Sequence, residues 1–384
     1  MKQNRALNTK KNPKILIIGG GIAGLTTLIS LRQRSANAEI TLVDHRDFHL
    51  KIPRLHEVLR HPSPPIKVPF KDIEDRFKCR FVKAEISLAR DAIGDIASSQ
   101  RLIISGESID FDYLVLATGL SDPTGNPEDL GCLTLRDFVE SDLKTLFIPK
   151  AKTQKTGADI VSIVGAGPTG VQFAFELVDY FERIGDARSV HVIDAGERPL
   201  ANFHSRVGQY VLDRMAQRGI KHHPCQRLVS SKPGQLILEH RDGSQHHQRS
   251  GITLRLTNTL SYAPFPVNLF GQALINKRSF TRVYIAGDLA QFKGPIPTAV
   301  SAQSAVRKGK LIAINILKSQ NWFPALRPYL HQDRGYIVSL GGQDAVGWIG
   351  SRGHIVKGSF ALRLREVVDK QYDLLLEGID TFII

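Results

Sequence analysis

Residues 14–34 read KILIIGGGIAGLTTLISLRQR, and this stretch decides the fold. After Lys14 come four apolar residues, three of them isoleucine, which predicts a short buried strand. Gly19, Gly21 and Gly24 follow in a Gly-x-Gly-x-x-Gly pattern and lead into a helix. In such a turn the first glycine permits a tight bend, the second lets the backbone approach a diphosphate, and the third packs helix against strand. The stretch therefore predicts a nucleotide-binding α/β unit.

The next predicted strand supports this interpretation. Residues 38–48, AEITLVDHRDF, read as a strand that ends at Asp44, twenty residues after Gly24. An acid at this distance can hold the hydroxyl pair of a ribose, while the N-terminus of the helix faces the phosphates. The combination of loop, helix, strand and acid predicts a dinucleotide site.

The same unit occurs a second time. Residues 158–181 read ADIVSIVGAGPTGVQFAFELVDYF and repeat the three glycines between a strand and a helix. SVHVIDAGERPL then ends a second strand at Asp194, whose charge would repel the extra phosphate of NADP and so favours NAD. Two such units predict an α/β protein with two Rossmann-like dinucleotide-binding domains.

Two further segments complete the first unit. FDYLVLATG predicts a buried strand over residues 113–116 that delivers an Ala-Thr-Gly turn to the nucleotide. Much later, RVYIAGDLA predicts a strand that ends in Gly287 and Asp288, where a carboxylate can bind a polyol. This order matches a flavoprotein in which FAD lies in an N-terminal domain completed by a late segment, with an NAD domain inserted between them.

We therefore expect the architecture of glutathione reductase. The predicted FAD-binding domain comprises residues 12–122 and 272–328, and the predicted NAD-binding domain comprises residues 123–271. Residues 329–384 predict a β-hairpin followed by an amphipathic helix.

Composition restricts the partners. The 384 residues include 51 Lys and Arg against 37 Asp and Glu, so the net charge of +14 favours an anionic partner surface. The chain has no basic motif interleaved with aromatic residues, so nucleic acid is not expected. No apolar run approaches the roughly 18 residues of a membrane-spanning helix.

The cysteines and histidines argue against two kinds of site. Cys79, Cys132 and Cys225 lie far apart and form no CxxC pair, so we expect no redox dithiol and a reducing, cytoplasmic compartment. Five histidines between His222 and His247 lack the spacing of metal ligands, so no metal site is expected.

The segment GPIPTAVSAQSAVRKGK, residues 294–310, predicts a helix that begins near Pro297. Ala299 and Ala302 would leave room for flat rings on one face of this helix. Its N-terminus would point at the flavin and stabilise negative charge on the reduced ring. Gln303 offers one donor and one acceptor to a flavin or a quinone.

With these motifs the chain resembles the type II NADH dehydrogenases, the monotopic NADH:quinone oxidoreductases among flavoproteins with two dinucleotide-binding domains. The resemblance extends from about Lys14 to Leu376. Four stretches carry it: VDHRDFHLKIPRLHEVL, GPTGVQFAFEL, AQSAVRKG and GYIVSLGGQDAVGWIG. The chain departs from the family at Arg307 and Lys308, where the family often has two glutamines.

The resemblance implies an enzyme that takes a hydride from NADH onto FAD and passes two electrons to a quinone without pumping protons. It places Glu176 near the nicotinamide and flavin rings and makes Glu176 and Gln303 the catalytic candidates. The expected FAD contacts are Gly19, Gly21, Ile22, Ala23, Gly24, Asp44, His45, Val82, Ala117, Thr118, Gly119, Gly287, Asp288 and Ala299. The expected NAD contacts are Gly165, Gly167, Pro168, Thr169, Gly170 and Asp194. The expected quinone contacts are Pro297, Ala302, Gln303 and Val306.

The sequence of the C-terminal tail is compatible with three different contacts. Apolar residues recur there at helical spacing, namely Phe360, Leu364, Val367, Val368, Leu375 and Ile379. Such a helix can lie on an anionic membrane surface, pack on the flavin domain, or pair two subunits as a homodimer. With membrane contact, the protein would be peripheral on the inner face of the cell membrane.

Two other functions remain open from the sequence. The basic surface also suits an NAD(P)H reductase of a small acidic electron carrier, as in rubredoxin and ferredoxin reductases. A flavoprotein that responds to reduction without turnover is the non-enzymatic alternative. A sulfide:quinone oxidoreductase is disfavoured because it needs a cysteine late in the chain, and none follows Cys225.

Overall fold

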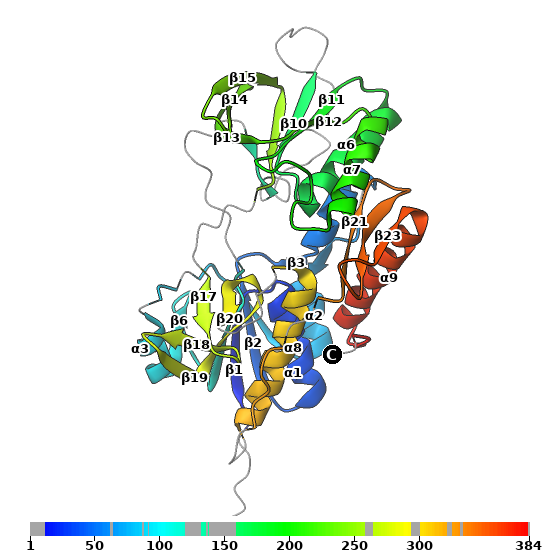
Figure 1. Ribbon diagram of the computed structural model, residues 1–384. Helices are drawn as coiled ribbons and strands as arrows, with labels where there is room; N and C mark the ends of the chain where they lie inside the picture. The colour runs from blue at the N-terminus through cyan, green and yellow to red at the C-terminus, as the bar shows by residue number, and fades with distance from the viewer. Residues whose placement is uncertain are drawn as a thin grey trace, which may run out of the picture.

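The computed structural model describes residues 12–61, 64–86, 88–90, 92–119, 132–135, 137, 159–257, 264–292, 300–320, 325–330 and 333–382. Figure 1 shows two α/β units, one above the other, with the C-terminal strands and helix beside both. The lower unit combines N-terminal residues with residues late in the chain, and the upper unit lies between them in sequence.

The lower unit is built on a sheet of eight strands in the order β20-β17-β18-β19-β8-β1-β2-β5. The five neighbours from β19 to β5 run parallel, and β18 runs antiparallel to β19. The strands are β1 (Lys14–Ile18), β2 (Glu39–Asp44), β5 (Arg80–Lys83), β8 (Tyr113–Leu116), β17 (Phe265–Val267), β18 (Gln272–Ile275), β19 (Arg278–Ile285) and β20 (Ala290–Phe292).

The two faces of β1 explain its continuous apolar sequence. Ile15 and Ile17 pack into a core on one face of the sheet, while Leu16 and Ile18 pack into a separate core on the other. A strand that is covered on both sides has no position for a polar side chain. The covering elements are α1 (Ile22–Arg34), α2 (Phe70–Phe77) and α8 (Ala302–Ser319) on the first face, and α3 (Ala92–Ser99) with the hairpin β6 (Arg101–Ile104) and β7 (Glu107–Asp110) on the second.

The upper unit repeats the parallel part of the lower one. Its sheet has the order β12-β11-β10-β16-β9, with every pair parallel, which is the order of β5-β2-β1-β8-β19. The predicted α/β fold with two Rossmann-like units is confirmed. The elements are β9 (Cys132–Leu133), β10 (Ile160–Val164), α6 (Pro168–Ile184), β11 (Ser189–Ile193), α7 (Ser205–Gln217), β12 (Lys221–His223), β16 (Ile252–Arg255) and the meander β13 (Gln226–Lys232), β14 (Gly234–His240) and β15 (Gln245–Ser250).

One predicted domain boundary differs from the sheet pairing. Strand β17 pairs with β18 and β20 in the lower sheet, although the sequence places residues up to 271 with the upper unit. Phe265 and Val267 are buried in the core of the lower unit, and this packing fixes the strand there. The rest of the domain division stays a prediction.

The C-terminal segment bridges the two units. The strands β21 (Gly335–Ser339), β22 (Ala345–Ile349) and β23 (Ile355–Lys357) form an antiparallel sheet, so the expected hairpin has a third strand. This sheet contacts α6 and α7 of the upper unit. The following helix, α9 (Gly358–Leu376), contacts α1 of the lower unit. The short helix η1 (Ile52–Leu59) contacts α6, between the strand β3 (Phe48–Leu50) and its partner β4 (Lys67–Pro69).

Helix α8 begins at Ala302, so the predicted start near Pro297 is wrong. Ser301 has an extended backbone and its hydroxyl accepts the N–H of Ser304 at 3.1 Å, which is the geometry of a helix N-cap. Pro297 and Ala299 lie outside the described residues.

Helix α8 lies against α1 at very short range. A Cβ atom on Gly309 would lie 2.6 Å from the backbone oxygen of Ala23, so only glycine fits this position. Thr27 of α1 places its hydroxyl 3.3 Å from the carbonyl oxygen of Gly309, 282 positions away in sequence. The contact holds the start of α8 beside the first glycine loop.

We expect Gly309→Ala to lower the melting temperature, because overpacking of this kind costs about 1–3 kcal/mol. Gly94→Ala in α3 is the matched control, since a Cβ there would meet nothing closer than 3.8 Å. The control should leave the melting temperature unchanged or raise it, because alanine favours helix. Thermal unfolding followed by circular dichroism checks both variants. Equal effects of the two substitutions would contradict the close packing of α8 on α1.

Candidate functional site

The first glycine loop is closed at both ends and open in the middle. Gly19 has a φ of +108°, and a Cβ there would collide with the carbonyl of Ala117. A Cβ on Gly24 would collide with the carbonyl of Gly19. Gly21 has no atom within 4 Å of its Cβ position, and no side chain caps α1 there. The uncapped N–H groups of α1 therefore face open space, as a diphosphate site requires.

The second loop has the same geometry. Gly165 also has a φ of +108°, and a Cβ there would lie 2.9 Å from the carbonyl oxygen of Leu256. Gly170 packs on Gly165, while Gly167 is open and α6 has no side-chain cap. Pro168 and Thr169 form the first turn of α6. Both predicted loops therefore present a free helix N-terminus.

The two predicted acids are held in equivalent positions. The carboxylate of Asp44 accepts the N–H of Gly20 at 2.7 Å, and that of Asp194 accepts the N–H of Ala166. In each unit the donor is the residue between the first two glycines. Each acid is thus fixed beside its loop, where a ribose would lie.

The late Gly-Asp segment reaches the first loop. A Cβ on Gly287 would lie 3.1 Å from the Cβ of Ala23, so this turn packs on the first turn of α1. Asp288 has a buried carboxylate oxygen, Oδ1, with no hydrogen-bond partner among the described residues. Burial raises the pKa of Asp288, and the neighbouring Lys308 ammonium lowers it. Since an unpaired buried acceptor is costly, the carboxylate fits a site for a ligand hydroxyl such as the polyol of a flavin.

The remaining predicted flavin contacts that the structure describes lie at the same edge of the sheet. The N–H of Ala117 donates to Ile18 at 2.7 Å, directly beside the first loop. His45 is exposed, with Nδ1 3.3 Å from Asp44, and Val82 pairs in register with Val43. The others placed there are Ile22 at the start of α1 and Thr118 and Gly119 after β8.

A buried lysine lies under the Gly-Asp turn and was not predicted as a site residue. Lys308 is fully buried, and its Nζ donates to the carbonyls of Gly287 at 2.7 Å and Ala290 at 3.3 Å. Burial lowers its pKa to about 8. The sequence did mark Lys308 as unusual, because the resembled family often has glutamine at this position.

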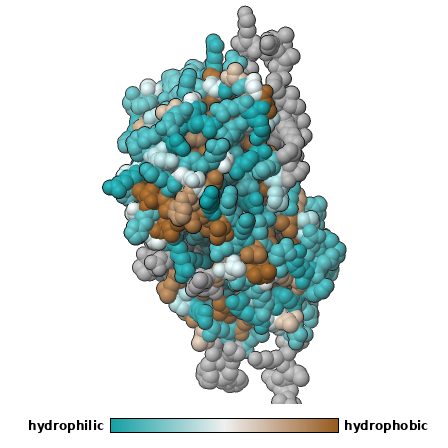
Figure 2. Space-filling model, turned by 90° about the vertical axis from the view of Figure 1, so that its right-hand side faces the viewer, coloured by the Kyte–Doolittle hydropathy of each residue, from teal (hydrophilic) through white to brown (hydrophobic). Residues whose placement is uncertain are grey.

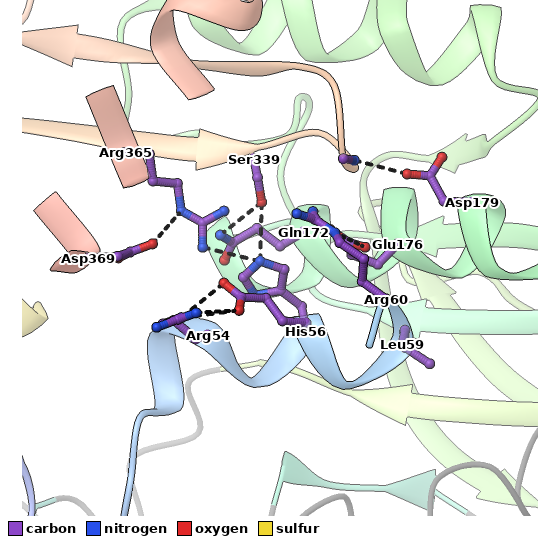
Figure 3. A network of polar contacts seen from close by, with 12 residues as sticks. Arg54, His56, Leu59, Arg60, Gln172, Glu176, Asp179, Ser339, Arg365 and Asp369 are labelled. Carbon is purple, nitrogen blue, oxygen red and sulfur yellow. Dashed lines mark hydrogen bonds and ion pairs between the residues drawn. The ribbon is translucent and has the colours of Figure 1, made fainter. Parts of the chain in front are cut away.

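Glu176 faces an arginine. Its side chain is buried on α6 and forms an ion pair with Arg60, whose Nε lies 3.3 Å from Oε2 (Figure 3). Burial raises the pKa of Glu176, and Arg60 partly offsets this effect. The predicted role of Glu176 beside the nicotinamide stays a prediction, and Arg60 is a partner that the sequence did not reveal.

Beside this pair, Figure 3 shows a buried polar network formed by residues of four elements, namely η1, α6, β21 and α9. Arg365 of α9 donates to Nε2 of His56 in η1 at 3.1 Å, and Ser339 of β21 lies 3.3 Å from the same nitrogen. Gln172 of α6 donates to Ser339 at 3.4 Å. Burial, together with Arg365 and other arginines, holds the pKa of His56 well below its usual value, so His56 is neutral and accepts. The network fixes α9 to the helix of the second loop.

A cavity that opens to solvent lies where α1, α8, η1 and α9 meet, and its empty space, counted with the solvent at its mouth, is about 460 Å³. Ile22 and three predicted acceptor contacts, Ala302, Gln303 and Val306, line one side. Residues of 51–54 and of α9 line the other. The structure therefore brings the described acceptor residues together beside the first glycine loop.

Comparisons with known proteins agree with the fold. The family model described as pyridine nucleotide-disulphide oxidoreductase matches residues 13–309. A protein of Staphylococcus aureus named type II NADH:quinone oxidoreductase is 25% identical over 402 residues, which cover 95% of this chain and 96% of the relative.

Solved structures share the fold over nearly the whole chain. The NDH2 of Plasmodium falciparum in complex with NADH matches with a TM-score of 0.78 at 13% identity, covering 96% of both chains. The sulfide:quinone oxidoreductase of Aquifex aeolicus matches with a TM-score of 0.71 at 18% identity, covering 96% of this chain and 92% of the other.

A membrane-spanning helix must be both long and apolar. Over the described ranges, no helix combines the two properties needed to cross a bilayer.

We expect Asp288→Asn to stabilise the protein without flavin and to weaken flavin binding. A carboxyl whose pKa is raised by folding loses stability as pH rises from its unfolded value through its folded value. The amide has no such titration, so the gain in melting temperature should be present at neutral pH and disappear in acid. Loss of a hydrogen bond to a charged group costs about 1.5–3 kcal/mol, so the flavin Kd should rise roughly 10- to 150-fold.

Thermal unfolding of the flavin-free protein at two pH values and fluorescence titration with FAD measure the two effects. Asp44→Asn is the matched comparison, because Asp44 already accepts the N–H of Gly20. That variant should destabilise the flavin-free protein. A fall in stability for Asp288→Asn would show that its carboxylate serves the fold rather than a ligand.

Proposed function

The chain belongs to the pyridine nucleotide-disulphide oxidoreductase family, and we propose that it is an FAD-dependent NADH:quinone oxidoreductase that does not pump protons. The observation that carries this proposal is the cavity between α8 and α9, which adjoins the start of α1 at Ile22. The name of the Staphylococcus aureus relative supports the same activity.

The lower unit holds FAD. The open backbone at Gly21 and the free N-terminus of α1 bind the diphosphate, and Asp44 binds the adenosine ribose. Asp288 accepts from the polyol chain with its unpartnered oxygen. When bound, the flavin accepts a hydride and passes on an electron pair.

The upper unit binds NADH. Gly167 and the start of α6 receive the diphosphate, and Asp194 holds the ribose and discriminates against NADPH. We assign Glu176 to the nicotinamide side of the site, where its ion pair with Arg60 holds both charged side chains in place. Gln303, in the first turn of α8, lines the cavity and can hydrogen-bond a quinone oxygen.

Positive charge near the turn after β19 supports electron transfer. The N-terminus of α8 and the buried ammonium of Lys308 both favour negative charge at the ring that would lie against them. Dithiol chemistry has no support in this member of the family. Cys79 is buried in the lower unit, burial raises its pKa to about 11, and Cys132 and Cys225 belong to the upper unit.

Anaerobic spectroscopy tests the proposal directly. NADH should bleach the flavin absorbance, and a menaquinone or ubiquinone analogue should restore it. A short-chain quinone should also sustain steady-state oxidation of NADH. Turnover only with a ferredoxin or rubredoxin would support a carrier reductase instead. Bleaching without turnover by any acceptor would indicate a flavoprotein that only responds to reduction. No feature of the described residues favours either alternative.

Helix α9 turns an apolar stripe to solvent, and we propose that this stripe binds an anionic membrane. Phe360 is 62% exposed, Val367 is 56% exposed, and Ile379 just beyond the helix is 55% exposed. Figure 2 looks onto this side of the molecule and shows apolar residues gathered on it. Val368 belongs to the stripe and also lines the cavity, so a lipid-soluble quinone could enter from the bilayer. The net charge of +14 suits the cytoplasmic leaflet.

We expect Phe360→Asp with Val367→Asp to abolish binding to vesicles that contain phosphatidylglycerol. Burial of one large apolar side chain contributes about 1.5–3 kcal/mol, so two substitutions should weaken binding by at least roughly 10²-fold. Turnover with a long-chain quinone in vesicles should fall, while turnover with a short-chain quinone in solution should persist.

Ile103→Asp is the control, because Ile103 is 71% exposed on the hairpin β6–β7. Vesicle sedimentation and NADH oxidation measure the effects. If vesicle binding is unchanged but a wild-type dimer becomes a monomer in the double variant, the stripe pairs two copies of the chain instead.

A further inference from the structure

Among the described residues that line the cavity between α8 and α9, one carries a carboxyl group. Asp369 of α9 and Gln303 of α8 both line this cavity. The side chain of Asp369 is 23% exposed. The acids nearby are engaged more tightly. The carboxylate of Asp373 forms ion pairs with Nζ of Lys51 at 2.6 Å and with the guanidinium of Arg54 at 3.1 Å. The carboxylate of Glu57 also pairs with Arg54, at 2.9 Å. Asp369 has a looser partner, because the Nε of Arg365 lies 3.7 Å away.

Arg365 is itself shared. Its NH2 group donates to Nε2 of His56 at 3.1 Å, so it does not pair with Asp369 alone. The charged groups that face Asp369 are Arg365 and Asp373 on its own helix and Arg54 and Glu57 on η1. Burial outweighs the two arginines and raises the pKa of Asp369 to about 6. The group can therefore bind and release a proton near neutral pH.

The other polar groups on this side of the cavity are unsuited to proton donation. Lys51 and Arg54 are cations held by Asp373. The hydroxyl of Tyr372 donates to Nε2 of His49 at 3.0 Å, because Nδ1 of that ring carries the proton that binds the carbonyl of Gly20 at 2.9 Å. Burial raises the pKa of Tyr372, so the phenol keeps its proton. Burial also lowers the pKa of His49 to about 4, so its ring stays neutral.

We propose that Asp369 is the proton donor to the quinone in this cavity, an inference that rests on the proposed function. Reduction of a quinone to a quinol requires two electrons and two protons. The hydride from NADH, relayed by the flavin, supplies both electrons and one proton. The carboxyl of Asp369 supplies the other, so its O–H bond breaks as an O–H bond forms on a quinone oxygen. A proton from solvent then restores the acid, and NADH, quinone and one proton give NAD⁺ and quinol.

The test separates the two half-reactions in Asp369→Asn. Reduction of the flavin by NADH under anaerobic conditions should proceed at the wild-type rate, because no quinone takes part. Turnover with ferricyanide, which accepts electrons without protons, should also be unchanged. Reoxidation of the reduced flavin by a short-chain quinone should slow by roughly 10²-fold, the usual contribution of a positioned acid. Glu366→Gln, on the exposed face of α9, is the control and should leave every rate unchanged.

The pH dependence gives a second, independent readout. In the wild type, reoxidation by quinone should slow as pH rises through about 6, because only the protonated acid can donate. The asparagine variant should lose this transition. Asp369→Glu should retain an acid limb with a shifted midpoint, which a purely structural role would not produce.

Three outcomes would overturn the inference. These are an unchanged quinone rate in Asp369→Asn, an equal loss of the quinone and ferricyanide rates, and a flat pH profile in the wild type. If Asp369→Asn does not fold, the pH profiles of the wild type and Asp369→Glu decide the matter. A wild-type protein that bleaches with NADH but reduces no quinone would instead disprove the proposed function.

Discussion

The close packing of α8 on α1 is the interaction on which the site depends. Gly309 allows the two helix backbones to approach without an intervening side chain, and a hydrogen bond from Thr27 to Gly309 accompanies the contact. Because α1 begins at the open loop and α8 begins at the acceptor cavity, their contact sets the distance between the two sites. A bulkier residue at position 309 would move α8 away from α1 and, with it, Lys308 away from the carbonyl of Gly287. The cofactor end and the acceptor end are thus fixed by one backbone contact.

The parts of this structure that follow from local rules were predictable from the sequence. Each glycine loop needs only a strand, a turn and a helix, so both were found at the correct residues. The start of α8 was misplaced because Pro297 suits a first helical turn, whereas the capping hydroxyl of Ser301 decides the boundary. Strand β17 was assigned to the wrong unit because three residues that include Pro266 carry no readable alternation.

The site residues that were missed share a different cause. The contacts of His56 with Ser339 and Arg365 join residues separated by 283 and 309 positions, and the pair of Arg60 with Glu176 spans 116. Side chains that meet only through the tertiary fold leave no periodic signal in the sequence. Their composition is also unremarkable, because arginine and serine are common on surfaces. Only the unusual lysine at position 308 was visible beforehand, as a departure from the resembled family.

The partners of the buried charged groups distinguish structural ion pairs from groups that could bind a ligand. Lys310 is buried but donates to Asp380 at 2.6 Å, so its desolvation is offset within the protein. Asp288 leaves Oδ1 without a hydrogen-bond partner among the described residues, and Asp369 has the more distant Nε of Arg365 at 3.7 Å; burial raises the pKa of both. A protein selected only for stability would pair or replace such groups, because each unpaired buried charge opposes folding. Their retention at the first loop and at the cavity is consistent with chemistry at those places.

Helix α9 combines a partly polar inward side with large apolar side chains that face solvent, and the proposed membrane contact rests on the second feature. Arg365 and Tyr372 lie on its inward side, where they contact His56 and His49, while Phe360 and Val367 face outward. A helix whose only role was to cover the protein would place its apolar side inward. Here the inward side carries both kinds of residue: Arg365 and Tyr372 contact η1 and the cavity, while Ala361, Leu375 and Leu376 supply apolar packing. The exposed Phe360 and Val367 take no part in that packing and are left for an apolar partner. The proposed lipid surface would cover that face and would supply, at the same mouth, the apolar substrate that the cavity is proposed to receive.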